Sequence, residues 1–383
     1  MIDFASSLYL GFRHPYWELE PWSQLTTGTP ATLGLPGPAH MVAGGLADLV
    51  GCEEATLARS TVHAFIDLIP MLAGPGSAIF VDAGTYPIGR WGVERAVGRG
   101  VPARSFAHHD AAALRASMRD RGVAGRRPLV LTDGVCPGCG DLAPLDAYLE
   151  AAQAAGGLPV IDETQALGVL GSDPSAAAPY GRGGGGSVPR AGLRSPRVVV
   201  VASLAKGLGA PVAVVAANRR LVRLFEDSSQ TRAHCSPPSA ADLHAAAAAL
   251  GANRHHGDGL RRTLWLRVQR FRRLIAGAGL RTLDSSFPVQ AVFLAGAEAT
   301  RLHRRLLGHG IRTVLQARGC RAEAAVVFVI TAAHTPRDID RAAAALAACP
   351  GAACPGAADP GTGSVRTRRP YAAMPAASGA PGR

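Results

Sequence analysis

Short apolar runs alternate with alanine-rich stretches between about residues 51 and 240. The apolar runs carry few polar residues on either face, which is typical of strands buried on both sides of a sheet. Strands are predicted over 78–81, 128–132, 158–162, 197–203 and 211–217, and the helices between them include 111–120 and 145–155. This order predicts an α/β fold with a mostly parallel sheet that helices cover on both faces.

The pattern changes after residue 240. A long helical stretch over 240–273 is followed by predicted strands over 289–294 and 325–331 and predicted helices over 299–307 and 336–347. We therefore expect an N-terminal arm over 1–50, a large domain over 51–240 and a smaller α+β domain over 241–348. Residues 349–383 are rich in Ala, Gly, Pro and Arg without periodicity, so they predict a disordered tail.

Composition narrows the class of protein. No run of about 18 apolar residues is free of charge, and the N-terminus lacks the basic start of a signal peptide, so we expect a cytoplasmic protein without a membrane segment. The glycine- and arginine-rich segment 180–196 predicts a flexible surface loop.

Cysteine usage argues against a disulfide framework, because seven cysteines are spread over 383 residues. Cys136 and Cys139 form a C-x-x-C motif, for which a redox pair or half of a zinc site is one interpretation. No second C-x-x-C or histidine pair is seen to complete a zinc site, and we interpret the motif as a turn.

The net charge of +12 raises the question of an acidic partner. Nucleic-acid binding is one interpretation. However, the basic residues are scattered apart from an arginine-rich helix around 261–273, and no aromatic residues are interleaved with them. We expect no nucleic acid, and an anionic cofactor or a thioester substrate accounts for a positive cleft equally well.

Lys206 is the single lysine among 40 basic residues, and all the others are arginines. Arginine cannot replace lysine where a primary amine must lose its proton and attack a carbonyl. Lys206 follows the apolar strand 197–203 and lies three positions after Ser203, so one ligand can be reached by both the amine and the hydroxyl. The alternative is an exposed lysine in a strand–turn–strand.

An acid and a helix start accompany this lysine. Asp162 ends the predicted strand 158–162, and ligands of open parallel sheets bind at the carboxyl ends of strands, where Ser203 and Lys206 also lie. Ser60 and Thr61 precede an amphipathic helix whose first N–H groups could hold a phosphate. Taken singly, Asp162 could instead be a helix N-cap, and the helix an ordinary capped one.

In this order the residues resemble the fold-type I enzymes that use pyridoxal 5'-phosphate (PLP), and among them the α-oxoamine synthase family. The resemblance covers roughly residues 1–348. It is carried by IDFASSLYLGF (2–12), DGVCPGCGDLAPLDAYLEAAQAAGGLPVIDETQALGVLG (133–171), SLAK (203–206) and VITAAHTPRDIDRAAAAL (329–346). It implies a large domain with a mostly parallel sheet of the seven-stranded type and a smaller C-terminal α+β domain.

The resemblance also implies roles for matching residues. Lys206 would hold PLP as a Schiff base and move protons at the substrate Cα, and Asp162 would pair with the pyridinium nitrogen. Ser203 and the backbone at Thr61 and Val62 would bind the phosphate. Ser236 matches a hydroxyl that reaches the phosphate across a dimer interface, which implies a homodimer with shared active sites.

Four positions depart from the family pattern. Gln165 replaces the histidine of D-E-A-H, and it could donate a hydrogen bond to the cofactor's 3-oxygen but cannot titrate near neutral pH. Tyr86 replaces the ring-stacking histidine and could still stack. Pro137 replaces a serine that contacts the substrate, and Arg318 lies within a residue or two of the arginine that binds the substrate carboxylate.

The favoured function is therefore the condensation of an amino acid with an acyl thioester to an α-amino ketone, in specialised biosynthesis. An aminotransferase is the alternative, because transamination uses the same electron sink. A third interpretation is a non-catalytic protein of this fold that binds a partner.

Overall fold

A computed structural model describes residues 1–348 of the chain except 20, 22, 279–283 and 317–322. The prediction of a disordered tail over 349–383 lies outside the described residues.

Seven strands form the large sheet in the order β2-β8-β7-β6-β5-β3-β4. β8 runs antiparallel to both of its neighbours, and all the other pairs are parallel. This confirms the predicted α/β fold, to which β2 and β4 add two strands that were not predicted. The strands are β2 (Glu54–Ala58), β3 (Ser77–Asp82), β4 (Ala103–Phe106), β5 (Arg127–Asp133), β6 (Leu158–Asp162), β7 (Val199–Ser203) and β8 (Ala213–Ala217).

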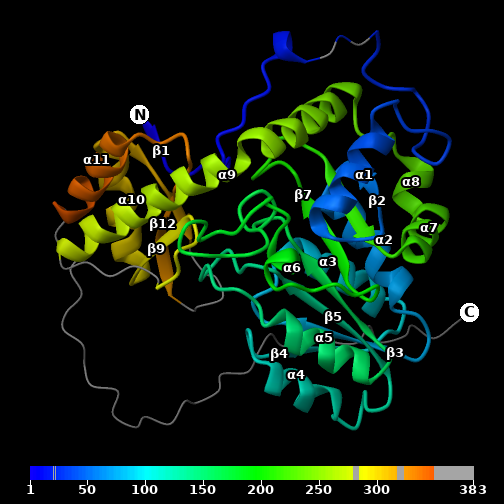
Figure 1. Cartoon of the computed structure of the whole chain (residues 1–383). Helices are drawn as coiled ribbons and strands as arrows, with labels where there is room; N and C mark the ends of the chain where they lie inside the picture. The colour runs from blue at the N-terminus through cyan, green and yellow to red at the C-terminus, as the bar shows by residue number, and fades with distance from the viewer. Residues whose placement is uncertain (20, 22, 279–283, 317–322, 349–383) are drawn as a thin grey trace, which may run out of the picture. The chain divides into compact units, whose positions relative to one another are not determined.

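Alternate side chains of these strands enter two separate cores. In β7, Val200 and Ala202 face one core, whereas Val199 and Val201 face the other. The first core also holds side chains of α1 (Ala39–Val50), α4 (Ala111–Met118) and α5 (Leu145–Ala154). The second holds those of α2 (Thr61–Leu72), α3 (Pro87–Val97) and α7 (Arg219–Ser228). Helices thus cover both faces of the sheet, as the double-sided apolar pattern predicts (Figure 1).

A second sheet has three antiparallel strands in the order β11-β12-β9. Its strands are β9 (Val289–Leu294), β11 (Val314–Gln316) and β12 (Ala324–Val329), and α10 (Gly296–Gly308) and α11 (Pro336–Ala347) contribute to the same core. β1 (Ile2–Asp3) pairs in parallel with β10 (Ile311–Arg312). The remaining short helices are η1 (Tyr16–Glu18), α6 (Ser187–Arg190) and α8 (Gln230–His234).

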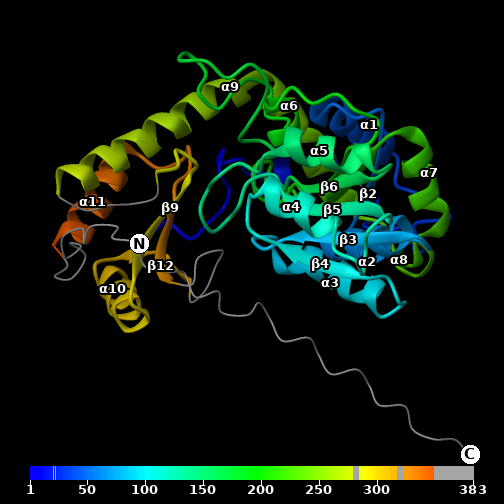
Figure 2. The ribbon, with the colours of Figure 1, turned by 90° about the horizontal axis from the view of Figure 1, so that it is seen from below.

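One helix, α9 (Ala240–Gly277), contributes to the cores of both sheets (Figures 1 and 2). Leu243 and Ala246 lie in a core of the large sheet, and Val268 and Phe271 lie in the core of the small one. Ser239 begins the helix with a capping box. Among the described helices, α9 included, none combines the length and apolar character needed to cross a membrane.

The N-terminal segment packs within the core of the smaller sheet. Phe4 and Tyr9 are completely buried. The ring of Phe4 stacks on His334 with 4.2 Å between ring centroids, and its carbonyl accepts the N–H of Val329 at 2.8 Å. This segment therefore brings Tyr9 beside the ends of the large sheet, where it contacts Gln165.

The prediction that 180–196 is a flexible surface loop is wrong for its central part. Residues 184–188 are buried, and the N–H groups of Ser187 and Val188 donate to the buried carboxylate of Glu163 at 2.8 and 2.9 Å. A Cβ at Gly186 would lie 2.6 Å from that carboxylate. The glycines let the backbone approach closely enough to satisfy a buried acid, which would otherwise be costly.

We expect Gly92→Ala to destabilise the protein by about 1–3 kcal/mol, because overpacking a close contact costs that much. A Cβ there would lie 2.4 Å from the carbonyl oxygen of Phe65, where α3 packs on α2. Gly259→Ala is the matched control, because that position in α9 has open space and alanine favours a helix by about 1 kcal/mol. Urea unfolding of both variants tests this, and an unchanged midpoint for Gly92→Ala would contradict the packing described.

Candidate active site

A cavity of about 170 Å³ lies at the carboxyl ends of the parallel strands. Its position is the one that an open α/β sheet offers to a ligand. It gathers six of the residues predicted from the sequence. The lining residues are Thr61, Tyr86, Ile88, Asp133, Pro137, Asp162, Thr164, Gln165, Ser203 and Lys206.

Two buried carboxyl groups lie side by side at one wall. Asp162 ends β6, Asp133 ends β5, and the two residues are paired in register. Burial raises the pKa of both groups, and the charge of Asp162 raises the pKa of Asp133 further. The N–H of Thr164 donates to the Asp162 carboxylate at 2.9 Å, and the N–H of Tyr86 donates to Asp133 at 3.0 Å. A cation at this wall is favoured, because it relieves the cost of burying negative charge.

Lys206 follows β7 and faces the same cavity. Burial lowers the pKa of its amine, whereas Asp162 and Asp133 oppose that shift. The neutral amine, which is the nucleophilic form, is therefore present at lower pH than in an exposed lysine. Its Nζ atom lies 5.9 Å from the centroid of the Tyr86 ring.

The start of α2 lacks a side-chain cap. Ser60 occupies the N-cap position but accepts no hydrogen bond from the helix backbone. Its hydroxyl pairs instead with Nδ1 of His63 at 2.7 Å. The first N–H groups of the helix are thus available to an anion, beside Thr61 and the Ser203 hydroxyl in the cavity wall.

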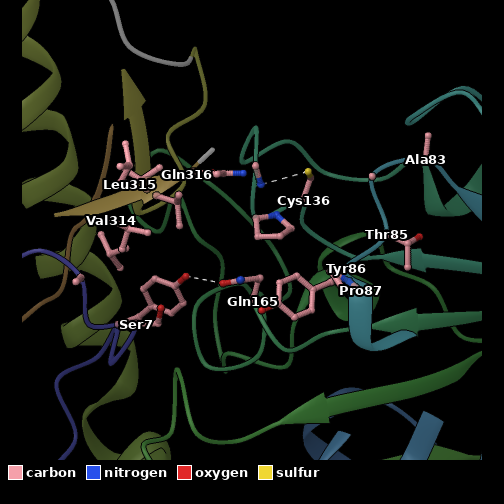
Figure 3. Close-up of a pocket in the computed structure, with 18 residues that line it drawn as sticks. Ser7, Ala83, Thr85, Tyr86, Pro87, Cys136, Gln165, Val314, Leu315 and Gln316 are labelled. Carbon is pink, nitrogen blue, oxygen red and sulfur yellow. Dashed lines mark hydrogen bonds between the residues drawn. The ribbon is translucent and has the colours of Figure 1, made fainter. Parts of the chain in front are cut away.

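Gln165 is held by Tyr9. The buried Tyr9 hydroxyl donates to Oε1 of Gln165 at 2.5 Å (Figure 3). Burial raises the pKa of the Tyr9 phenol, which stays protonated and remains a donor. Since the amide oxygen is engaged, its N–H groups are left to donate to a ligand in the cavity.

A larger cavity of about 510 Å³ adjoins the first, and Tyr86, Pro137 and Gln165 line both. Figure 3 shows Val314, Leu315 and Gln316 of β11 on the side opposite Thr85, Tyr86 and Pro87. Aliphatic side chains from all three strands of the smaller sheet take part in the lining: Val289, Val314, Leu315, Val327 and Val329. The ionisable side chains therefore lie at the large sheet, and an aliphatic wall lies at the small one.

Three predicted residues are not placed in the smaller cavity. Val62 follows Thr61 in α2, and Ser236 lies between α8 and α9, but neither is among the described residues that line it. Arg318 lies outside the described residues. Asp133 and Thr164 line the cavity but were not predicted. The end of the strand predicted over 128–132 was the available signal for Asp133, by the same argument that identified Asp162.

The functional groups that line the smaller cavity fit PLP. A carboxylate suits a protonated ring nitrogen, the amine suits an aldehyde, and an uncapped helix start beside a serine suits a phosphate. These groups lie at the strand ends of a mostly parallel seven-stranded sheet. The fold and the site together define a PLP-dependent enzyme of fold type I.

The chain belongs to the 8-amino-7-oxononanoate synthase family of α-oxoamine synthases. It is 30% identical over 324 residues to the enzyme of that name from Alkalilimnicola ehrlichii, covering 81% of this chain and 79% of that one. The Sodalis glossinidius enzyme is also 30% identical, over 88% of this chain and 85% of its own. Enzymes of this family use PLP to condense an amino acid with an acyl thioester. No protein-family model matches the chain.

Solved structures agree with the fold. A serine palmitoyltransferase from S. paucimobilis is 19% identical, with a TM-score of 0.80 over 91% of this chain and 86% of that one. The 8-amino-7-oxononanoate synthase of Francisella tularensis is 18% identical, with a TM-score of 0.70 over 90% of this chain and 96% of that one.

We expect Tyr9→Phe to weaken PLP binding about 5- to 30-fold, because losing a buried hydrogen bond costs about 1–2 kcal/mol. Without Tyr9 the Gln165 amide can turn its oxygen toward the ligand. Tyr180→Phe is the matched control, because its buried hydroxyl donates to the Ser286 carbonyl outside this cavity. Titration of each variant with PLP, followed by fluorescence, measures the dissociation constants. Equal constants for the two variants would show that Tyr9 does not orient Gln165.

Proposed function

We propose that this chain condenses an α-amino acid with an acyl thioester to give an α-amino ketone. One observation carries the proposal: the small cavity around Lys206, which holds two carboxyl groups and an amine, shares Tyr86, Pro137 and Gln165 with a larger cavity that has an aliphatic wall. The ionisable groups suit an amino acid on the cofactor, and the aliphatic wall suits an acyl chain.

PLP supplies an electron sink that stabilises negative charge at the substrate Cα. The amine of Lys206 would hold the cofactor at its aldehyde and would move the proton at Cα, a role that its lowered pKa suits. Asp162 would pair with the ring nitrogen and favour its protonated form. Asp133 is paired in register with Asp162 and adds a second carboxyl group beside it.

The remaining residues orient the cofactor. Backbone N–H groups at Thr61 and Val62, with the Ser203 hydroxyl, hold the phosphate. Tyr86 would stack on the ring, and Gln165 would donate to the 3-oxygen. Because Gln165 cannot titrate, it orients the ring without exchanging a proton, and Lys206 remains the proton carrier.

On the substrate side of the site, one residue of the family pattern is replaced by a residue without a hydroxyl group. Pro137 lines both cavities and offers no hydroxyl, so the substrate loses one hydrogen bond there. We assign the substrate carboxylate to Arg318, which follows two positions after Gln316 of the larger cavity in the sequence. A changed amino acid or acyl group fits a specialised biosynthetic pathway.

The reaction is tested with PLP-loaded protein, single L-amino acids and acyl-coenzyme A of graded chain length. We expect the visible absorbance of the bound cofactor to persist with amino acid alone. Free thiol should appear only after the acyl-coenzyme A is added. Lys206→Ala should release no thiol. Conversion of the cofactor to its amine form by an amino acid alone would identify an aminotransferase, and no response from the wild type to any pair would favour a non-catalytic protein.

We also propose a homodimer with shared active sites, because Ser236 matches a hydroxyl that reaches the phosphate from the partner subunit. Ser236 is partly exposed and lies outside the smaller cavity of its own chain, as this arrangement requires. Sedimentation equilibrium should give twice the chain mass of 39.4 kDa. Ser236→Ala should weaken PLP binding without changing that mass. A monomer that is fully active would contradict the proposal.

A further inference from the structure

A cluster of sulfur and imidazole groups lies beside the active site. Cys136 and Cys139 belong to the turn after β5, and His108 and His109 belong to the turn after β4. The sequence pattern indicated no histidine pair that completes a zinc site, but the fold brings His108 and His109 beside Cys139. The ligand atoms of His108, His109 and Cys139 all lie within 4.8 Å of one another.

The separation between His108 and Cys139 suits a tetrahedral metal. Nε2 of His108 lies 3.4 Å from Sγ of Cys139. Metal–ligand bonds of about 2.0 Å to nitrogen and 2.3 Å to sulfur place neighbouring tetrahedral ligands roughly 3.3–3.8 Å apart. A set of imidazole and thiolate ligands selects zinc over magnesium or calcium, which prefer oxygen.

Asp82 orients His108 for this role. Its buried carboxylate pairs with Nδ1 of His108 at 2.6 Å, so Nε2 faces Cys139. The same carboxylate accepts the Tyr148 hydroxyl and the His109 N–H, both at 2.9 Å. A histidine that binds zinc through one nitrogen and a carboxylate through the other is the usual outer-shell arrangement of zinc sites.

The backbone around the cluster is shaped to bring these groups together. A Cβ at Gly84 would lie 2.2 Å from Nδ1 of His108, so only glycine allows the ring this position. His109 has a φ of 54°, in the left-handed region that a non-glycine residue rarely adopts. The N–H of Gly138 donates to Sγ of Cys136 at 3.4 Å, which holds the second thiol at the start of the C-x-x-C turn.

We propose that His108, His109 and Cys139 bind one Zn²⁺, with Asp82 as the outer partner of His108. The metal ties the turn after β4 to the turn that carries Pro137, which lines both cavities. The proposal does not depend on the acyl-transfer reaction, since it concerns the shape of this turn.

Metal analysis of the full-length protein, produced with added zinc and purified without a histidine tag or chelator, tests the site. We expect about one zinc per chain by mass spectrometry. Cys139→Ser and His109→Asn should each lower the retained zinc at least tenfold. Asparagine is chosen because it tolerates the left-handed backbone of His109. Cys235→Ser and His255→Asn are matched controls outside the cluster, and they should retain zinc as the wild type does.

A second measurement separates metal binding from folding. Wild-type protein stripped of zinc and reconstituted with Co²⁺ should show sulfur-to-cobalt charge-transfer absorbance and the visible bands of a tetrahedral ion. Cys139→Ser should lose the charge-transfer band while its circular dichroism matches the wild type. Zinc content that is negligible in the wild type, or equal in the wild type and both cluster variants, would overturn the proposal. A Cys136–Cys139 disulfide in protein purified under nitrogen would also overturn it.

Discussion

Two carboxyl groups buried side by side are the constraint on which the site depends. Asp133 and Asp162 end neighbouring parallel strands, in register, at the edge of the sheet where the strand termini converge. Neither can be ionised there without a compensating positive charge, and burial raises the pKa of each. In the function that we propose, Lys206 and a protonated cofactor nitrogen supply that charge, and Lys206 follows β7, the next strand of the sheet.

Segments far apart in the sequence complete this edge. The N-terminal Tyr9 holds Gln165, which lies 156 positions further along the chain, and α2 brings its uncapped start to the same cavity. Glu163, next to Asp162, is satisfied by backbone donors of a glycine-rich segment. The end of β6 is thus followed directly by buried polar contacts, which help to fix its position.

A third strand-end acid, Asp82, lies at the same edge of the sheet. Asp82 ends β3, as Asp133 and Asp162 end their strands, and its carboxylate gathers His108, the His109 backbone and Tyr148. Three strand-end acids thus lie along one edge of the sheet. In our proposals, Asp162 holds a cofactor and Asp82 orients the imidazole of a zinc site.

By itself the sequence determined the layers of the fold and six residues that the structure gathers in one cavity. Apolar strands with no polar face require a sheet covered on both sides, and a lone lysine after such a strand has few other roles. It could not show that Asp133 or Thr164 joins the cavity, that the glycines of 184–186 are buried, or that His108 and His109 meet the C-x-x-C turn. Those facts depend on strand order and on loops that approach from different strands, and only tertiary packing sets such distances. Local periodicity specifies which residues face a core, whereas the spatial order of the strands decides which strand ends become neighbours.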